Sequence, residues 1–493
     1  MDDKLHNIDK LHNISEPAPA SDHADRLVEA LVVRKISTNR TEALDFIDWM
    51  LKRSWADYQK DCMDIRIIIM NRINGIDLAI ANGTKGKPYV SAPITLPTDI
   101  AYDYQFEGLE EIGLKAVPGA EKGSYTIEGT PTCAGDFTIV LRYKYDGWLE
   151  GRDLLERRIP FAVNADPREI MEQSQKPTPT DYPYYKEDRV CEYVKVAAAA
   201  DGTARKDVVA ASVRGRSHGR EGRPRDDHFR IAFDPSNQWY VLAVADGAGS
   251  AKYSRKGSEV ACNTAVEYCR SRLSSASDFE AAITGYRTAT DEAAARKALG
   301  NHIYAIVGNA AFQAHKAIKD VSGLVPESSM RDFATTLMLA ICKKFDFGWF
   351  VASFWVGDGA MGIYDKEKQT FRLLGVPDEG EFSGQTRFLT MPEIFSDHAA
   401  LYKRLRFGFF DDFTALMLMT DGVSDPMFGT DANLNSIGCW NEFWTRLKSG
   451  FPDDGIGGVD FSDDNDAAKD QLMRWLDFWV RGEHDDRTIA ILY

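Results

Sequence analysis

The 493-residue chain lacks several features that would place it in a particular class of protein. Its longest mainly apolar stretch, residues 349–356, is far shorter than the roughly 18 residues of a membrane-spanning helix. The segment after Met1 is polar and has no apolar core of the kind found in signal peptides. The seven cysteines are scattered and odd in number, which predicts neither a disulfide scaffold nor a zinc site. These absences favour a soluble cytoplasmic protein without a membrane partner.

The chain also has fewer basic than acidic residues. The 59 Lys and Arg residues stand against 75 Asp and Glu residues, which gives a formal net charge of −16. Because general nucleic-acid binding needs a basic face, this balance argues against DNA or RNA as a partner. A hydrophobic fraction of 44% is ordinary for a folded protein, and the length suggests a multi-domain chain.

Two segments precede the first predicted β-structure. Residues 1–20 are polar and repeat the hexapeptide Asp-Lys-Leu-His-Asn-Ile, so we expect a mobile leader without a core. Residues 21–82 carry apolar side chains at helical spacing, including Leu44 and Leu51, after a predicted helix cap at Thr41. Such a stripe is typical of a core face or of an interface between helices.

Residues 83–165 change to short strands separated by glycine- and proline-containing turns. The alternating run 137–141 is the clearest strand, and the spacing predicts a small antiparallel sandwich. The run Gly129-Thr130-Pro131-Thr132, followed by 134–138, resembles the turn before the last strands of bacterial immunoglobulin-like modules. The resemblance implies a binding or spacer module, whose partner the sequence does not identify.

A linker is predicted at residues 166–189, before a long C-terminal domain at 190–493. Pro177, Pro179 and Pro183 stand among threonine, aspartate and tyrosine, a composition that stays extended and does not pack. From residue 190 onward the pattern again predicts packed strands and long helices, so we expect this domain to carry the chemistry.

Aspartates stand at the ends of apolar strands throughout the C-terminal domain. A buried strand end is an unfavourable place for a carboxylate, and several carboxylates at one edge repel each other. Mg²⁺ or Mn²⁺ would remove this conflict, since both prefer oxygen ligands. Asp-Gly is also a common turn signal, so only the recurrence of the pattern predicts a metal site. The four pairs are Asp246-Gly247, Gly357-Asp358, Asp421-Gly422 and Asp485-Asp486.

The order of the motifs resembles the metal-dependent protein phosphatases, the type 2C serine/threonine class, and specifically a bacterial branch of it. The resemblance extends over about 205–493, and residues 385–390 look like a strand characteristic of that branch. In chain order the matching motifs are Asp226-Asp227, Asp246-Gly247, Ala334-Thr335-Thr336, Gly357-Asp358, Asp421-Gly422 and Asp485-Asp486-Arg487-Thr488.

The resemblance implies an α+β catalytic domain, a four-layer α/β/β/α sandwich of two antiparallel sheets flanked by helices. It implies hydrolysis of phosphoserine and phosphothreonine in proteins by a water that bridges two Mn²⁺ or Mg²⁺ ions and is acidified by them. A phosphorylated protein substrate and a cognate serine/threonine kinase are the implied partners. We expect residues 190–493 to retain activity toward a small phosphate ester without the N-terminal half.

Metal-binding roles follow from the resemblance position by position. Asp246 would bridge the two ions, and the carbonyl of Gly247 would bind one of them. Asp421 and Asp485 would complete the protein ligands of the other ion. The remaining coordination would be water.

Three further aspartates have implied positions near the ions. Asp227 would lie at the edge of the site and hold metal-bound waters, and Asp358 would lie near a third ion, where one is present, shared with Asp421. Asp425 matches a family position near the metal, but an N-cap or turn aspartate before Pro426 explains it at least as well.

Phosphate binding is where the sequence departs from the better-known branch. There an arginine four residues before the acidic pair grips the phosphate, whereas this chain has Gly222 at that position. His218, in a Gly-x-Ser-His spacing that resembles the bacterial branch, is a candidate phosphate contact or general acid, with a hydrogen-bonded loop histidine as an equal alternative. Arg220, Arg223 or Arg225 could supply the bidentate fork, or could form a solvated basic loop.

Two other interpretations fit the same residues. The missing arginine and the large N-terminal half allow a regulatory or scaffold protein with a catalytically degenerate phosphatase fold. The retention of Asp246, Asp421 and Asp485 argues against it. A different carboxylate-metal hydrolase, such as a nuclease, is the other alternative, and the net charge of −16 disfavours it.

Overall fold

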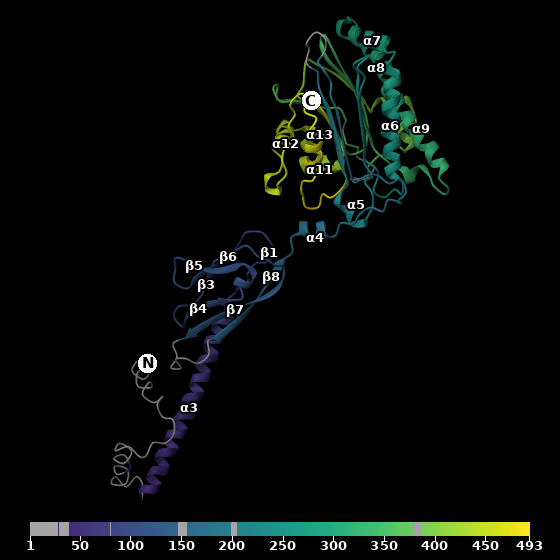
Figure 1. Cartoon of the computed structure of the whole chain (residues 1–493). Helices are drawn as coiled ribbons and strands as arrows, with labels where there is room; N and C mark the ends of the chain where they lie inside the picture. The colour runs from purple at the N-terminus through teal and green to yellow at the C-terminus, as the bar shows by residue number, and fades with distance from the viewer. Residues whose placement is uncertain are drawn as a thin grey trace. The chain divides into compact units, whose positions relative to one another are not determined.

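A computed structural model describes most of the chain, which divides into two compact units, Met1–Ile170 and Met171–Tyr493 (Figure 1). The predicted leader at 1–20 lies outside the described residues. No helix within the described part is long and apolar enough to span a membrane. The described residues are 28, 39–78, 80–145, 155–198, 205–375, 377–378 and 386–493.

The first unit contains a long helix, α3 (Arg40–Asn74), and two β-sheets. One sheet has the strand order β1-β8-β7-β4, and the other has the order β2-β6-β3 with β5 paired to β6. All of these pairs are antiparallel except β1 with β8. The strands are β1 (Gly83–Thr84), β2 (Tyr89–Val90), β3 (Ile94–Thr95), β4 (Ala101–Glu107), β5 (Leu114–Pro118), β6 (Ser124–Gly129), β7 (Gly135–Tyr145) and β8 (Leu155–Asn164).

Side chains from both sheets form one core, in which Ile127 of β6 and Ile139 of β7 are fully buried. The first unit therefore contains a two-sheet β-region where the sequence predicts one. Its immunoglobulin-like character stays a prediction.

Helix α3 differs from the sequence prediction in its first turns. Its N-cap is Asn39, whose side chain accepts a hydrogen bond from the N–H of Glu42 at 2.9 Å, so the predicted cap at Thr41 is wrong. Leu44 and Leu51 are exposed, at 38% and 62%, and do not form the predicted core face. The Asn39 side chain, two residues earlier, caps the helix instead, and spacing alone does not distinguish the two positions.

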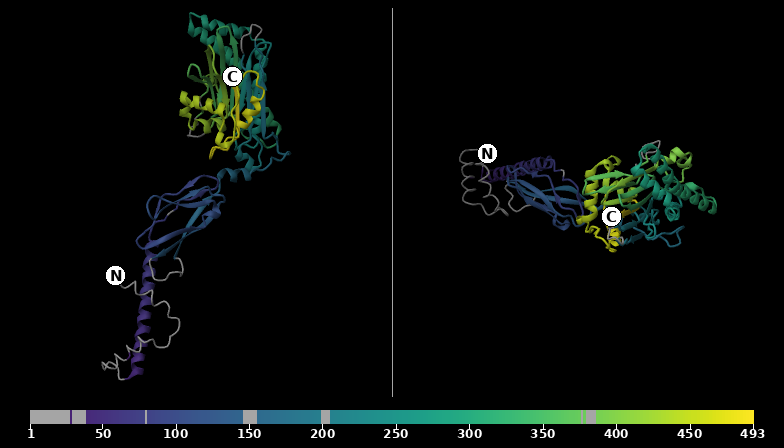
Figure 2. Two further views of the ribbon diagram at one scale, coloured as in Figure 1. Left: turned by 60° about the vertical axis from the view of Figure 1, so that its left-hand side comes forward. Right: turned by 90° about the horizontal axis from the view of Figure 1, so that it is seen from above.

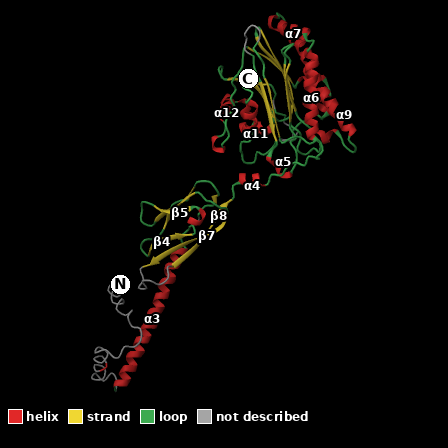
Figure 3. Cartoon of the chain, in the orientation of Figure 1, coloured by secondary structure: helices red, strands yellow, loops and turns green. Residues whose placement is uncertain are grey.

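The second unit is built on two antiparallel sheets that lie between two layers of helices (Figures 1 and 3). The six-stranded sheet has the order β16-β15-β18-β19-β10-β9, and the five-stranded sheet has the order β11-β12-β13-β14-β17. Its strands are β9 (Arg189–Val194), β10 (Val208–Val213), β11 (His228–Phe233), β12 (Tyr240–Ala245), β13 (Leu337–Phe345), β14 (Gly348–Val356), β15 (Ala360–Asp365), β16 (Thr370–Leu373), β17 (Leu405–Phe410), β18 (Ala415–Met419) and β19 (Arg487–Leu492).

Helices α6 to α9 cover the five-stranded sheet, and α11 to α13 cover the six-stranded sheet. Seen from above in Figure 2, the yellow C-terminal helices lie on the opposite side of this unit from the teal and green helices. Helix α4 (Pro167–Gln173) crosses the boundary between the two units. The other helices of the second unit are α5 (Arg216–Glu221), α6 (Ser254–Leu273), α7 (Ser277–Thr288), α8 (Glu292–Ile303), α9 (Asn309–Leu324), α10 (His398–Tyr402), α11 (Asp421–Phe428), α12 (Ile437–Ser449) and α13 (Ala468–Trp475).

The strands of the second unit are continuously apolar because both faces of each sheet are covered. Along β12, Val241 and Ala243 face the helices, while Leu242 and Val244 face the other sheet. This alternation is the period of two that a β-strand imposes. Because both faces of each sheet are covered, polar side chains can cluster only at the ends of the strands.

The strand expected at residues 385–390 is absent from its described part. Residues 386–390 form a loop, and the N–H of Leu389 donates to the carbonyl of Thr335 at 2.7 Å. Leu389 is buried against the helical layer, which explains its apolar character without a strand.

Candidate active site

Carboxylates from three connections meet at one edge of the sheet sandwich. Asp246 follows β12, Asp358 lies between β14 and β15, and Asp421 opens α11 directly after β18. One carboxylate oxygen of each lies within 4.8 Å of the other two. The structure thus brings together three aspartates that lie far apart in the sequence.

The backbone of Asp246 is held by the two threonines of the predicted small-Thr-Thr motif. The Thr335 hydroxyl donates to the Asp246 carbonyl at 2.7 Å, and the Thr336 N–H donates to the same oxygen at 2.8 Å. The Thr336 hydroxyl accepts from the N–H of Asp246, also at 2.8 Å. At Gly247 a Cβ atom would lie only 2.7 Å from the Asp226 carbonyl oxygen, so this position has no space for a side chain.

Asp358 is held by a tight turn and by Thr386, whose hydroxyl donates to Asp358 Oδ2. Gly357 has a φ of +121°, and a Cβ there would lie 2.5 Å from Thr336 Cβ. Its N–H donates to Asp378 Oδ2 at 3.0 Å, and both oxygens of Asp378 pair with Arg404 at 2.7 and 3.0 Å. Only glycine combines this backbone conformation with such close packing.

Asp227 lies buried next to this group, where the Thr420 hydroxyl donates to its Oδ2 at 2.9 Å. Burial and the negative charge of Asp486 raise the pKa of Asp227 to about 7. Burial and neighbouring carboxylates also raise the pKa values of Asp246 and Asp421 well above the usual range. Within the described part of the chain, none of these aspartates pairs with a cation.

The donor set fits a hard divalent cation. Asp227 Oδ1 and Asp358 Oδ1 are buried and have no hydrogen-bond partner among the described residues. Buried acceptors without a partner are rare, and together with uncompensated carboxylates they match the oxygen ligands that Mg²⁺ and Mn²⁺ prefer. The side chains of Asp227, Asp246, Asp358 and Asp421 are therefore placed to hold such ions.

A cleft of about 670 Å³ opens beside the aspartates. Asp421, Asp425 and Asp485 line it, and Asp485 is exposed there. Asp425 lies inside α11, whose N-cap is Thr420, so the alternative interpretation of Asp425 as an N-cap is wrong. Burial and the charge of Asp358 raise the pKa of Asp425 to about 6.

The candidate phosphate-binding arginines occupy different environments. Arg220, at the exposed end of α5, lines the cleft and makes no ion pair or hydrogen bond within the described residues. Arg223 donates to Asp226 Oδ2 and to the Gly249 carbonyl, both at 3.0 Å. Arg225 is buried and donates to the carbonyl of Asp227 at 3.2 Å. Of the three arginines, Arg220 alone has its charge free to face the cleft.

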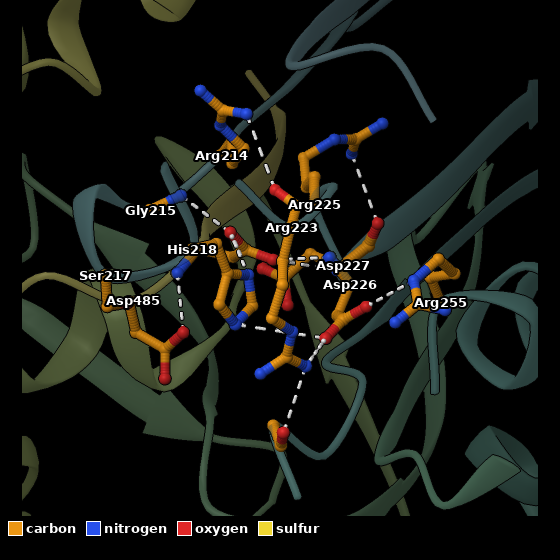
Figure 4. A network of polar contacts seen from close by, with 12 residues as sticks. Arg214, Gly215, Ser217, His218, Arg223, Arg225, Asp226, Asp227, Arg255 and Asp485 are labelled. Carbon is orange, nitrogen blue, oxygen red and sulfur yellow. Dashed lines mark hydrogen bonds and ion pairs between the residues drawn. The ribbon is translucent and has the colours of Figure 1, made fainter. Parts of the chain in front are cut away.

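His218 is buried between two carboxylates, with Nδ1 3.0 Å from Asp486 Oδ1 and Nε2 3.8 Å from Asp226 Oδ2 (Figure 4). Burial alone would lower the pKa of His218, but the charge of Asp486 raises it to about 9. Burial would raise the pKa of Asp486, yet His218 and the N–H groups of Gly215 and Asp226 hold it at about 2. The predicted roles of His218 as phosphate contact or general acid stay predictions.

Asp226 forms the second charged group of the network in Figure 4. Its Oδ1 accepts from Arg255 Nε at 2.9 Å and its Oδ2 accepts from Arg223 Nη2 at 3.0 Å. Asp486 Oδ2 accepts from the N–H of Asp227 at 3.3 Å. Asp226 and Asp486 thus fix the backbone that presents Asp227.

Sequence reasoning assigned no role to Asp486 or Arg255. In the sequence, Asp486 is only the second residue of the Asp485-Asp486 motif. The family resemblance implies a metal-binding role for Asp485 and none for Asp486. Arg255 lies in the second position of α6, and no local pattern distinguishes it from a surface arginine. Its burial beside Asp226 is a tertiary fact.

The model of the protein phosphatase 2C family matches residues 214–477, which is more than half of the chain. The chain belongs to the protein phosphatase 2C family. The match covers α5, the acidic pair and the aspartates up to Asp425, and ends before Asp485. A comparison with curated proteins gives no match.

Solved structures of phosphatases resemble the chain at low sequence identity. A bacterial serine phosphatase has 14% identity and a TM-score of 0.34, covering 58% of this chain and 96% of its own. The serine/threonine phosphatase Stp1 from Staphylococcus aureus has 14% identity and a TM-score of 0.32, covering 61% and 96%. RsbX in complex with magnesium has 12% identity and a TM-score of 0.32, covering 62% and 100%. Similarity at this level is no basis for assigning a function.

The segment predicted as a linker packs onto the phosphatase 2C unit. Residues 171–189 belong to the second unit, which begins at Met171 and not at residue 190. The N–H of Lys176 donates to the Gly219 carbonyl at 2.8 Å, and the Thr178 hydroxyl donates to the Arg223 carbonyl at 3.1 Å. We call residues 175–189 the strap. Proline lacks a backbone N–H, but the carbonyls and the neighbouring residues of the strap can still form hydrogen bonds with the folded unit. Composition alone does not show whether they do.

Lys186 of the strap reaches the acidic pair. Its buried Nζ donates to the carbonyl of Asp227 at 3.0 Å and to the Ser258 hydroxyl at 2.9 Å. Burial lowers the pKa of Lys186 to about 7. At the same time the Pro183 carbonyl accepts from Arg255 Nη1 at 3.3 Å. The strap therefore supports the backbone on which Asp227 is mounted.

Stability without metal should fall as pH rises. Because their pKa values are raised, Asp227, Asp246 and Asp421 bind more protons in the folded chain than in the unfolded chain, so stability falls as pH rises from the usual carboxyl pKa to these raised values. The raised pKa is about 7 for Asp227 and well above the usual range for the other two. In EDTA we expect a lower melting temperature at pH 8 than at pH 6, and a smaller decrease in Asp421→Asn. His218 and Lys186 titrate in both proteins, so their effects cancel in the comparison.

Saturating Mn²⁺ should raise the melting temperature of the wild type at pH 8 and raise that of Asp421→Asn much less. The same pH scan by differential scanning fluorimetry gives both results. An Asp421→Asn protein that is less stable than the wild type at pH 8 in EDTA would contradict mutual repulsion of the carboxylates.

The strap argues against the sequence-based expectation that residues 190–493 are active alone, and it predicts where the catalytic unit can be cut. Residues 171–493 should fold and bind Mn²⁺ like the full chain, whereas 190–493 should bind Mn²⁺ weakly because the support of Asp227 is lost. Calorimetric titration of both proteins with Mn²⁺ measures the difference.

In the full chain, Lys186→Met removes the Nζ donors but retains most of the side-chain volume. The Asp227 carbonyl then loses a hydrogen bond, and an unpaired buried carbonyl lowers the free energy of unfolding by about 1–3 kcal/mol. Lys176→Met, at the less buried end of the strap, is the matched control. Equal Mn²⁺ affinity of 171–493 and 190–493 would show that the strap does not support the site.

Proposed function

We propose that the chain is a metal-dependent serine/threonine protein phosphatase that acts on phosphoserine or phosphothreonine in proteins. The observation that carries the proposal is the convergence of Asp246, Asp358 and Asp421 within 4.8 Å, without a cation, at the edge of a cleft. Family membership supports the phosphatase chemistry, and the site supplies the residues for it.

The bound ions would supply the charge that acidifies a water molecule and neutralises the phosphate oxygens. Asp246 and Asp421 would hold the ions, with Asp485 at the mouth of the cleft and the Gly247 carbonyl beside Asp246. Asp227 would orient water through its unpaired Oδ1. Asp246 and Asp227 are held by Thr335, Thr336 and Thr420 before substrate arrives, which is the preorganisation that catalysis requires.

Arg220 is the residue that we assign to the substrate phosphate. A guanidinium binds phosphate through two parallel N–H donors, and Arg220 has its donors free in the cleft. Arg223 and Arg225 already hold Asp226 and the backbone of Asp227. The arginine missing at Gly222 is thus replaced by one two residues earlier, at the end of the same short helix.

His218 contributes by holding a proton on each ring nitrogen in its ion pairs with Asp486 and Asp226. Its positive charge keeps Asp486 ionised, and ionised Asp486 accepts from the N–H of Gly215 at 2.6 Å. This arrangement supports α5, which carries Arg220. A cognate kinase and a cytoplasmic location remain part of the proposal, with the partner of the first unit unassigned.

Metal-dependent turnover is the direct test. The purified full chain should hydrolyse p-nitrophenyl phosphate and a phosphothreonine peptide with Mn²⁺ or Mg²⁺, and EDTA should abolish both reactions. Asp246→Asn should lose turnover by several orders of magnitude and remain folded, because it removes the charge of a carboxylate that would hold the ions. Asp320→Asn, an exposed aspartate on α9, is the matched control.

Turnover that survives in a folded, metal-saturated Asp246→Asn protein would overturn the assignment. Absence of turnover in the wild type, together with weak Mn²⁺ binding by calorimetry, would favour the degenerate phosphatase fold. Cleavage of DNA in place of the phosphate esters would favour a nuclease.

Substitution of Arg220 should separate phosphate binding from structure. Arg220→Ala should lower kcat/KM for the phosphothreonine peptide by about ten- to a hundredfold, the effect of losing a charge-assisted contact, with an unchanged melting temperature. Arg223→Ala should lower the melting temperature as well, because it leaves buried Asp226 with one arginine fewer. Equal kcat/KM for Arg220→Ala and the wild type would refute the phosphate role of Arg220.

A further inference from the structure

A second cavity of about 760 Å³ lies in the phosphatase 2C unit and shares no lining residue with the catalytic cleft. Helices α8 and α10 form part of its wall, together with β16 and β17, the edge strands of the two sheets. Four of its lining side chains are basic and none is acidic. The basic residues are Arg296, Lys297, Arg372 and Arg406.

The arginines are held in place by contacts other than ion pairs. Arg372 Nη2 donates to the Phe407 carbonyl at 3.0 Å, and the Arg296 guanidinium lies 5.4 Å from the centre of the Phe407 ring. The Arg406 guanidinium lies 4.8 Å from the ring of Trp355. Carbonyl and aromatic contacts orient a guanidinium but leave its charge in place.

This positive charge is uncompensated in the described part of the chain. None of the four basic side chains forms an ion pair there, although the chain as a whole carries a net charge of −16. Burial and the charge of Arg372 lower the pKa of Arg406. Four positive charges close together repel each other, and a bound anion would relieve this repulsion.

Apart from Asn301, the rest of the cavity wall is apolar or aromatic. Ile303, Leu405 and Phe407 line it, and the Tyr402 hydroxyl donates to Asn301 Oδ1 at 2.8 Å, which ties α10 to α8. The volume lies in the range of small-molecule sites, which are typically apolar with a few placed polar groups. A macromolecule would need a larger surface.

We propose that this cavity is a second binding site, for a small molecule that carries phosphate groups and an apolar or aromatic part. The arginines would bind the phosphates through their forked donors, as guanidinium groups do for this geometry. The apolar part would pack on Leu405 and Phe407. The site lies outside the catalytic residues and extends the protein beyond its proposed reaction.

Calorimetric titration of the full chain in EDTA tests the proposal without catalysis. The probes are ADP, which combines two phosphates with an aromatic base, and pyrophosphate, which has the phosphates alone. The background is Arg220→Gln, which removes the candidate phosphate contact of the catalytic cleft. We expect ADP to bind this protein as it binds the wild type, and more tightly than pyrophosphate.

The cavity variants are Arg296→Gln with Lys297→Gln, and separately Arg372→Gln, all at exposed side chains. Each should weaken ADP binding roughly tenfold or more, since each removes charge-assisted contacts. The control is Lys316→Gln with Lys319→Gln, which removes the same charge from exposed positions of α9. The cavity variants and the control pair, made in the wild-type background, should keep the wild-type melting temperature and metal-dependent hydrolysis.

Absence of ADP binding, or binding that the cavity variants leave unchanged, would overturn the site. Equal weakening by the control pair would show a general charge effect and would also overturn it. Pyrophosphate binding as tight as that of ADP would overturn the apolar part of the assignment. Loss of hydrolysis in the wild type would refute the proposed function and leave these binding results intact.

Discussion

Repulsion among buried carboxylates is the constraint on which the catalytic unit depends. Asp246, Asp358 and Asp421 meet half-buried beside the buried Asp227, and burial and the charge of Asp486 raise the pKa of Asp227 to about 7. A protein that only needed stability would replace such residues with apolar ones. Their presence at one point requires a compensating positive charge, and divalent ions are the compensation that fits oxygen ligands and unpaired buried acceptors.

The basic side chains of the site pair with other aspartates, so the metal-facing aspartates still need a compensating positive charge. Arg223 and Arg255 pair with Asp226, and His218 pairs with Asp486, so the structural aspartates are neutralised by the protein itself. No described cation pairs with the metal-facing aspartates. The two classes lie next to each other in the sequence, as Asp226-Asp227 and Asp485-Asp486, and face opposite partners. Neutralising one member of each pair fixes the backbone that exposes the other.

The sheet sandwich and the strap supply the rigidity that this arrangement needs. Strand ends present Asp246 and Asp421, and Thr335 and Thr336 fix the backbone of Asp246 from the neighbouring strand connection. The strap adds Lys186 from a segment outside the sheets. Catalytic positioning in this unit therefore comes from several layers, none of which carries the chemistry itself. The basic cavity lies on other elements, where the edge strands of both sheets end, and its arginines are held by aromatic rings and carbonyls.

The sequence alone determined the parts of this protein that depend on local pattern. Apolar runs ending in aspartate predicted strand ends with carboxylates, and the order of the motifs predicted the family to which the chain belongs. A two-sheet region at 83–165 followed from strand and turn spacing. Tertiary structure decided the rest, because it depends on which distant residues meet. The proline-containing segment packs as a strap, Arg220 is left free while Arg223 is paired, and Asp486 is neutralised by His218. Residue type fixes what charge a side chain can carry, and only the folded neighbourhood fixes whether that charge has a partner.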